Sequence, residues 1–102
     1  MHQYIVYRVD RSDGQAAAIR AATRPLHRDY MAQFADRVRI GGPILGADGQ
    51  ACGGMMVIDA ASEAEVRAIV DADPFELAGL SAQIDIHPFR WQTSRPADLP
   101  PL

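Results

Sequence analysis

His27 is the residue best suited to acid–base chemistry in this 102-residue chain. It belongs to an apolar stripe at helical spacing with Tyr30, Met31 and Phe34, which turns the imidazole toward a sheet rather than toward water. Imidazole side chains ordinarily titrate near neutral pH, so such a group can both accept and donate a proton. The same position also suits a core histidine that is hydrogen-bonded to a backbone carbonyl or a carboxylate. The residues alone leave both interpretations open.

Asp73, in the sequence Ala-Asp-Pro-Phe, has a structural and a chemical interpretation. Aspartate followed by proline is typical of a helix start, with Asp73 as the N-cap and Pro74 in the first turn. A capping aspartate can also direct an oxygen at a neighbouring imidazole, where it fixes the tautomer and stabilises the imidazolium. The two roles are compatible, so Asp73 is a candidate partner of His27.

Three further positions could contact a substrate. Arg24 lies one helical turn before His27, where its guanidinium could hold an anion through two parallel hydrogen bonds; a solvated surface arginine is the alternative. Tyr30 could donate a hydrogen bond or simply pack against its neighbours. Gly42 and Pro43, in the sequence Gly-Gly-Pro, could let a ligand approach the backbone closely, or could bend an edge strand at a bulge.

The composition argues against several classes of site and partner. All ten basic residues are arginine, which excludes Schiff-base catalysis by lysine and a P-loop. The formal charge of -3 at pH 7 disfavours nucleic acid as a partner. The three histidines and one cysteine lack metal-ligand spacing, and no dinucleotide-binding glycine pattern is present. We therefore predict no metal, no cofactor and a small-molecule ligand.

Features that bear on location point to the cytoplasm. A single cysteine, Cys52, cannot form an intrachain disulfide. Charged residues between Met1 and Arg11 interrupt the apolar core that a signal peptide needs. No apolar run approaches the roughly 20 residues of a membrane span, so no membrane partner is expected.

Hydrophobic spacing and turn residues predict six main elements for one domain over residues 1–91, followed by a proline-rich tail over residues 92–102. Because Pro25 is costly inside a helix, we expect a break or kink near residues 23–24 and a main helix from Pro25 to Arg37. A capping-box spacing from Ser62 to Glu65 predicts the second helix, and Gly79 suits a left-handed stop after a short turn. The predicted elements are strands 2–8, 38–45, 54–59 and 80–91 with helices 25–37 and 63–72.

This order is strand, helix, strand, strand, helix, strand, which predicts the α+β ferredoxin-like fold: a four-stranded antiparallel sheet with both helices on one face. Apolar side chains occupy both faces of the strands, as Tyr4 and Val6 alternate with Ile5 and Tyr7. Two helices can cover only one face. We therefore expect a two-fold homodimer in which the second faces pack together into a barrel-like core.

Several short motifs, in this order, resemble the YciI-like (YCII-related) family over roughly residues 4–91. They are Arg24-Pro-Leu-His27-Arg-Asp-Tyr30, Gly42-Pro43, Gly53-Gly54 leading into Met-Met-Val-Ile-Asp59, Asp73-Pro-Phe75-Glu-Leu-Ala-Gly79-Leu80, and Ile86-His-Pro88-Phe89. The resemblance implies a dimeric α+β barrel and an active site in which His27 and Asp73 pair. The predicted substrate-binding residues are Arg24, Tyr30, Gly42, Pro43 and Phe75. Gly54 stands where many relatives have a serine, and the tail lies outside the pattern.

Two functions remain open at this point. The first is a cofactor-independent lyase or isomerase in which His27 moves a proton, Asp73 orients it, and Arg24 or backbone N–H groups near Gly42 hold a developing oxyanion. Related barrel enzymes act on small, often aromatic or enol-forming compounds, which suggests the substrate class. The second is a dimeric protein that binds a small metabolite without turnover.

Overall fold

One antiparallel sheet of four strands organises the computed structural model, which describes residues 1–102. The strands are β1 (His2–Asp10), β2 (Val38–Leu45), β3 (Ala51–Ala60) and β4 (Ser81–Pro88). Their spatial order is β2-β3-β1-β4, with the β2–β3, β3–β1 and β1–β4 pairs all antiparallel. The first and last strands of the chain are therefore neighbours, as a ferredoxin-like topology requires.

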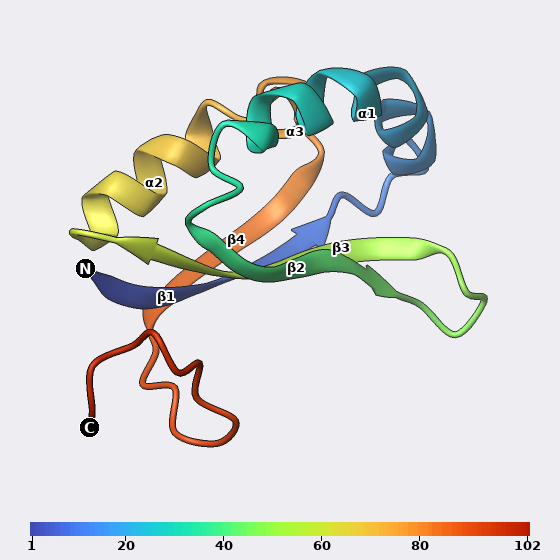
Figure 1. Ribbon diagram of the computed structural model, residues 1–102. Helices are drawn as coiled ribbons and strands as arrows, with labels where there is room; N and C mark the ends of the chain where they lie inside the picture. Colours follow the sequence, from blue (N-terminus) through green and yellow to red (C-terminus); the bar gives the residue numbers. More distant parts are fainter.

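Helices cover one face of this sheet (Figure 1). They are α1 (Ala16–Ala32), α2 (Glu63–Asp71) and the single turn α3 (Pro74–Leu77). Because side chains alternate along a strand, Tyr4 and Val6 of β1 and Met56 and Ile58 of β3 point toward the helices and form the core. The predicted fold class is confirmed: this is the βαββαβ protomer fold of the dimeric α+β barrels.

The helix signals that depend on short-range capping are confirmed. The Ser62 hydroxyl accepts a hydrogen bond from the backbone N–H of Glu65 at 3.2 Å, at the start of α2. The Asp73 carboxylate accepts one from the N–H of Phe75 at 2.9 Å, at the start of α3. Gly79 follows α3 with a φ of +78°, a left-handed conformation that glycine adopts without strain.

The helix has no break at Pro25, and the predicted bounds of the main helix, Pro25 to Arg37, are wrong. Helix α1 runs without interruption from Ala16 to Ala32 with Pro25 inside it, and it ends five residues before Arg37. Proline cannot donate to the carbonyl of Ala21, one turn earlier, but both residues are exposed, so water can satisfy that carbonyl. Residues 33–37 form turns rather than a continuation of the helix.

Two strand boundaries also differ from the expected ones. β3 begins at Ala51 rather than near Gly54, because Ala51 and Gly53 pair with Leu45 and Ile44 across the hairpin. A Cβ on Gly53 would collide with the backbone oxygen of Arg8, so this part of the strand needs glycine despite its low strand propensity. β4 ends at Pro88 rather than Trp91, and the chain then leaves the sheet.

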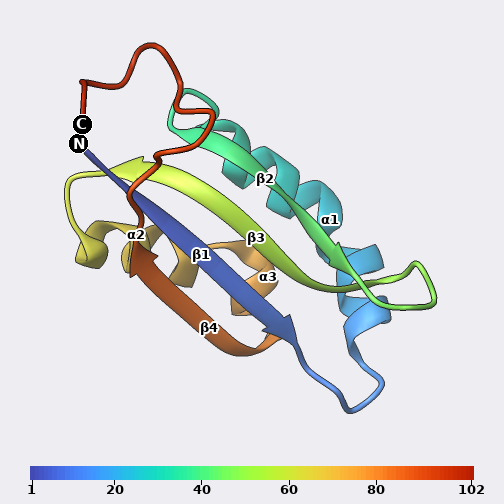
Figure 2. The ribbon, with the colours of Figure 1, turned by 90° about the horizontal axis from the view of Figure 1, so that it is seen from below.

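The other face of the sheet carries apolar side chains and the tail. Ile5, Tyr7 and Ile40 share that face through their pairing with β3, and Tyr7 and Ile40 are 43% and 53% exposed. Residues 89–102 lie on this side, away from the helices (Figures 1 and 2). Arg39 ties the tail to the sheet by pairing with both Asp59 and Asp98. None of the helices has the length and apolar character needed to cross a membrane.

Candidate active site

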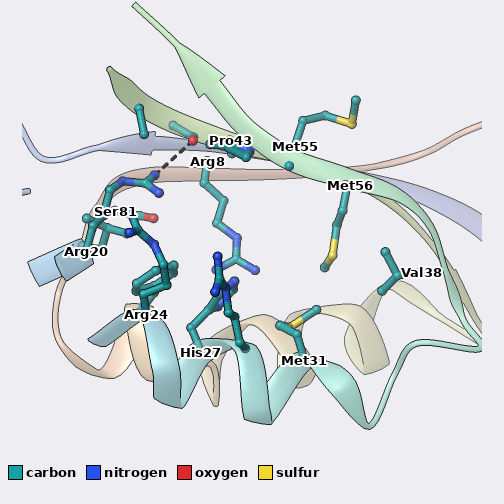
Figure 3. Close-up of a pocket in the computed structure, with 18 of the residues that line it drawn as sticks. Arg8, Arg20, Arg24, His27, Met31, Val38, Pro43, Met55, Met56 and Ser81 are labelled. Carbon is teal, nitrogen blue, oxygen red and sulfur yellow. Dashed lines mark hydrogen bonds between the residues drawn. The ribbon is translucent and has the colours of Figure 1, made fainter. Parts of the chain in front are cut away.

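A cavity of about 710 Å³ opens between α1 and the strands β1, β2 and β3. Figure 3 shows Arg8 and Met56 reaching into it from the sheet, and His27 and Met31 from the helix below. Phe75 of α3 and Ser81 of β4 also line it. The cavity therefore has a charged side around Arg8 and His27 and an apolar side around Met31, Val38 and Met56.

His27 and Asp73 are hydrogen-bonded across this site. His27 projects from the middle of α1, and Asp73 caps α3, which packs beside α1. The Nδ1 atom of His27 lies 2.8 Å from Oδ1 and 3.0 Å from Oδ2 of Asp73. The imidazole also stacks on the Phe75 ring, with 4.1 Å between ring centroids and 19° between planes. These contacts fix both the position and the orientation of the ring.

The Asp73 carboxylate is wholly buried and remains ionised. Burial alone raises the pKa of a carboxyl group, but here it is outweighed by hydrogen bonds from His27 and from the N–H of Phe75, together with the charge of Arg8. The pKa of Asp73 consequently lies below its usual value. A carboxylate can only accept hydrogen bonds, so Nδ1 of His27 carries the hydrogen of this contact. The other ring nitrogen, Nε2, has no partner in the protein and belongs to a side chain that lines the cavity.

Arg8 joins this pair to a second carboxylate and was not foreseen from the sequence. Its Nη1 atom lies 2.8 Å from Oδ2 of Asp73 and 2.8 Å from Oε2 of Glu76, while Ser81 donates to the same Glu76 oxygen at 2.7 Å. The Arg8 side chain is only 12% exposed. A signal was present: Arg8 has the strand parity of Tyr4 and Val6, which places a charged residue on the helix-facing side of β1.

Arg20 and Asp10 form a second charged pair at the rim of the cavity. Two guanidinium nitrogens of Arg20 each lie 2.8 Å from a carboxylate oxygen of Asp10, and one also donates to the carbonyl of Gly53 at 3.0 Å. The Arg20 guanidinium lies 5.5 Å from the centroid of the Phe75 ring. These contacts hold α1 against β1 and β3 beside the site.

The structure brings together most of the residues singled out from the sequence. Arg24, His27, Gly42, Pro43 and Phe75 all line the cavity. Tyr30 does not: its hydroxyl donates to the carbonyl of Ile69 at 2.7 Å, and its ring packs against the core. Burial and the nearby Asp73 charge raise the pKa of Tyr30, which keeps the hydroxyl protonated as a donor. Its role is therefore to attach α1 to α2.

The geometry suits proton transfer at one atom. An imidazole held by Nδ1–H against a buried carboxylate presents the Nε2 lone pair to whatever occupies the cavity. The carboxylate stabilises the imidazolium that forms when Nε2 takes a proton. His2, Cys52 and His87 do not join this site, and no three metal-binding side chains cluster anywhere in the structure.

Comparisons with known proteins agree with this architecture. The YCII-related domain model matches residues 2–90. The structure of 5-chloro-2-hydroxyhydroquinone dehydrochlorinase (TftG) from Burkholderia phenoliruptrix AC1100, in complex with 2,5-dihydroxybenzoquinone, is similar with a TM-score of 0.77. The two sequences are 32% identical, and the match covers 88% of this chain and 93% of that one. No curated protein sequence matches the chain.

More distant structures share the fold alone. A NIPSNAP family protein from Agrobacterium tumefaciens is 16% identical with a TM-score of 0.55, covering 94% of this chain and 99% of that one. A NIPSNAP domain protein from Burkholderia xenovorans is 12% identical with a TM-score of 0.54 and the same coverage.

Proposed function

The chain belongs to the YCII-related family, and from that premise we propose that it is a cofactor-independent acid–base enzyme of the lyase or isomerase type. Its substrate is a small, aromatic or enol-forming metabolite. The observation that carries the proposal is the arrangement of His27, with Nδ1 bonded to buried Asp73 and Nε2 left for the cavity. The similar dehydrochlorinase, which was crystallised with a dihydroxybenzoquinone, supports the substrate class.

In the proposed reaction, Nε2 of His27 takes a proton from a carbon next to a carbonyl-type group. The electron pair of the broken C–H bond forms the double bond of an enolate. In an isomerisation, the imidazolium returns the proton to a different atom of the substrate. In an elimination, the electron pair instead expels a leaving group as its anion, and the imidazolium then gives its proton to that anion or to water. Arg24, which lines the cavity from the same helix, offsets the negative charge that the substrate gains.

Arg8 acts in this scheme as a positioning residue. Arg8 forms no hydrogen bond with His27. Its Nη1 atom lies 2.8 Å from Oδ2 of Asp73 and so helps to hold that carboxylate in place. With its charge in place, Asp73 stays ionised and fixed toward His27. Gly42 and Pro43 form part of the opposite wall; a Cβ at Gly42 would meet nothing within 4 Å, so this stretch of backbone borders open space.

We also propose that the active form is a homodimer joined through the sheet faces that the helices leave uncovered. Ile5, Tyr7 and Ile40 lie on that face, and leaving such side chains in water forgoes roughly 1.5–3 kcal/mol each. Light scattering at rising concentration tests the assembly. We expect twice the 11.1 kDa mass for the wild-type chain and a monomer for Tyr7→Glu; a wild-type monomer at all concentrations would refute it.

Solvent deuterium incorporation tests the acid–base proposal directly. The protein is incubated in heavy water with 2,5-dihydroxybenzoquinone and other enolisable ring compounds, and exchange of ring protons is followed by NMR. We expect exchange with wild-type protein and with Arg67→Gln, whose side chain lies on α2 outside the cavity. His27→Gln should abolish it. Binding without any exchange would favour the metabolite-binding alternative.

A further inference from the structure

Four arginines line the cavity, and they fall into two classes. Arg8 is paired with Asp73 and Glu76, and Arg20 is paired with Asp10. Both of these arginines are largely buried, and their charges are already paired within the protein. The other two, Arg24 and Arg28, are exposed and form no ion pair or side-chain hydrogen bond in the structure.

The two unpaired arginines lie on the same strip of α1 as the proposed base. Arg24, His27 and Arg28 occupy positions i, i+3 and i+4, which share one face of a helix, and all three line the cavity. Figure 3 shows Arg24 and His27 both rising from α1 into the space below the sheet. An anion placed beside His27 therefore has two guanidinium groups within about one helical turn.

The local charge is opposite to that of the whole chain. Four arginines line the cavity, and three carboxylates pair with two of them: Asp73 and Glu76 with Arg8, and Asp10 with Arg20. This group of side chains carries one net positive charge while the imidazole is neutral. The chain as a whole has a formal charge of -3. A positive site in a negative protein attracts small anions to that site.

The rest of the wall fits an apolar ring. Met31, Val38 and Met56 point into the cavity (Figure 3). Phe75, whose ring stacks on His27, also lines it. A flat apolar body with an acidic group at one edge would match both sides of the cavity at once.

We propose, building on the acid–base function above, that the substrate is a ring compound that carries a permanent carboxylate, held by Arg24 and Arg28 while His27 reacts at a neighbouring atom. One counter-ion, Arg24, is enough for a charge that develops only during the reaction. The presence of a second free guanidinium, Arg28, is explained when the two arginines together also bind a group that is ionised before the reaction begins. Guanidinium groups match planar carboxylates through paired hydrogen bonds.

Isothermal titration calorimetry with three matched probes tests this proposal. The probes are 2,5-dihydroxybenzoate, its methyl ester and hydroquinone, which share the ring and both hydroxyls and differ only in the acidic group. We expect wild-type protein to bind the carboxylate about tenfold or more tightly than either neutral probe, with a preference that weakens as salt is added.

Variants assign that preference to the two arginines. Arg24→Gln and Arg28→Gln should each weaken carboxylate binding by at least about threefold, and the double variant should bind all three probes equally. Arg67→Gln serves as the matched control because it removes an exposed helical arginine far from the cavity and should change nothing. All four variants should melt at the temperature of the wild-type protein, because the replaced side chains form no ion pair in the structure.

The outcomes separate this proposal from the acid–base function. Equal binding of the three probes, no binding of the carboxylate, or a preference that survives in the double variant would overturn the carboxylate assignment. Carboxylate preference that persists in His27→Gln supports it even if no compound exchanges protons, which would remove only the enzymatic function. Exchange of neutral compounds without carboxylate preference would leave the enzyme and remove the acidic substrate.

Discussion

Arg8 and His27 bind the same buried carboxylate from two sides. The Arg8 guanidinium lies 2.8 Å from Oδ2 of Asp73, and Nδ1 of His27 lies 2.8 Å from Oδ1. One anion thus holds together a strand residue and a helix residue that lie far apart in the sequence. Any change at Asp73 therefore affects both side chains.

Removing the charge of Asp73 should separate its capping role from its role toward His27. In Asp73→Asn the amide oxygen can still accept from the N–H of Phe75, because asparagine caps helices nearly as well as aspartate. Because a neutral amide cannot stabilise the His27 imidazolium as the carboxylate does, kcat should fall by about a hundredfold or more. Asp73→Ala should lose, in addition, about 1 kcal/mol of unfolding free energy. Steady-state kinetics and urea unfolding check both variants; unchanged kcat in Asp73→Asn would refute the role.

Acid should destabilise the wild-type protein through Asp73. Its pKa is lower in the folded state than in the unfolded chain, so at acidic pH the unfolded state binds more protons. The resulting stabilisation is complete above about pH 4 and is lost as the pH falls through the folded-state pKa. Urea unfolding between neutral and acidic pH should show a steeper decline for wild-type protein than for Asp73→Asn. If the unfolding free energies of the two proteins fall in parallel with pH, Asp73 is not the source of the acid sensitivity.

Arg8→Gln should lower kcat while leaving KM close to that of the wild-type protein. Arg8 holds the Asp73 carboxylate at 2.8 Å and forms no hydrogen bond with His27. Without this contact Asp73 is held less firmly toward His27, so the step that His27 carries out should slow. Steady-state kinetics measure the two constants; a merely structural role would lower stability and leave kcat of the folded protein unchanged. The control is Arg11→Gln, whose guanidinium pairs with Asp13 at the surface and should leave both constants in place.

The two glycines at the start of β3 should respond differently to alanine. A Cβ at Gly53 would collide with the backbone oxygen of Arg8, which cannot move without disturbing β1. Gly53→Ala should therefore cost roughly 1–3 kcal/mol of unfolding free energy. At Gly54 the nearest atom to a Cβ is the carbonyl oxygen of Gly42 at 3.8 Å, so Gly54→Ala should be tolerated. Thermal and urea unfolding of the pair measure the difference, and similar losses in both would be inconsistent with this reading of β3.

The fold was predictable from the sequence because its signals are local. The caps at Ser62 and Asp73 and the stop at Gly79 each depend on atoms within three residues. The order of strands and helices then limits the topology to the ferredoxin-like arrangement. The helix has no break at Pro25 because the cost of the proline there depends on exposure of the Ala21 carbonyl, which only the packed structure reveals.

The candidate site was predictable only in part. His27 and Asp73 stood out because their residue types and neighbours suggested chemistry, and the fold brings them together. The contribution of Arg8 depends on Asp73 and Glu76, which are 65 and 68 residues away in the sequence. Tyr30 was placed with the substrate-binding residues because its hydroxyl could donate a hydrogen bond, but in the structure that hydroxyl donates to the backbone carbonyl of Ile69.

The apolar side of the cavity has a different mechanical character from the charged side. Met31 and Met56 are unbranched, flexible and polarisable, and they can change rotamer without disturbing a hydrogen bond. Arg8, Asp73 and Glu76 are locked in a network that permits no such adjustment. Under the proposed function, ring substituents of varied bulk would fit against the thioethers while the reacting edge keeps its alignment, so tolerance of substrate shape and constancy of chemistry would reside in opposite halves of one pocket.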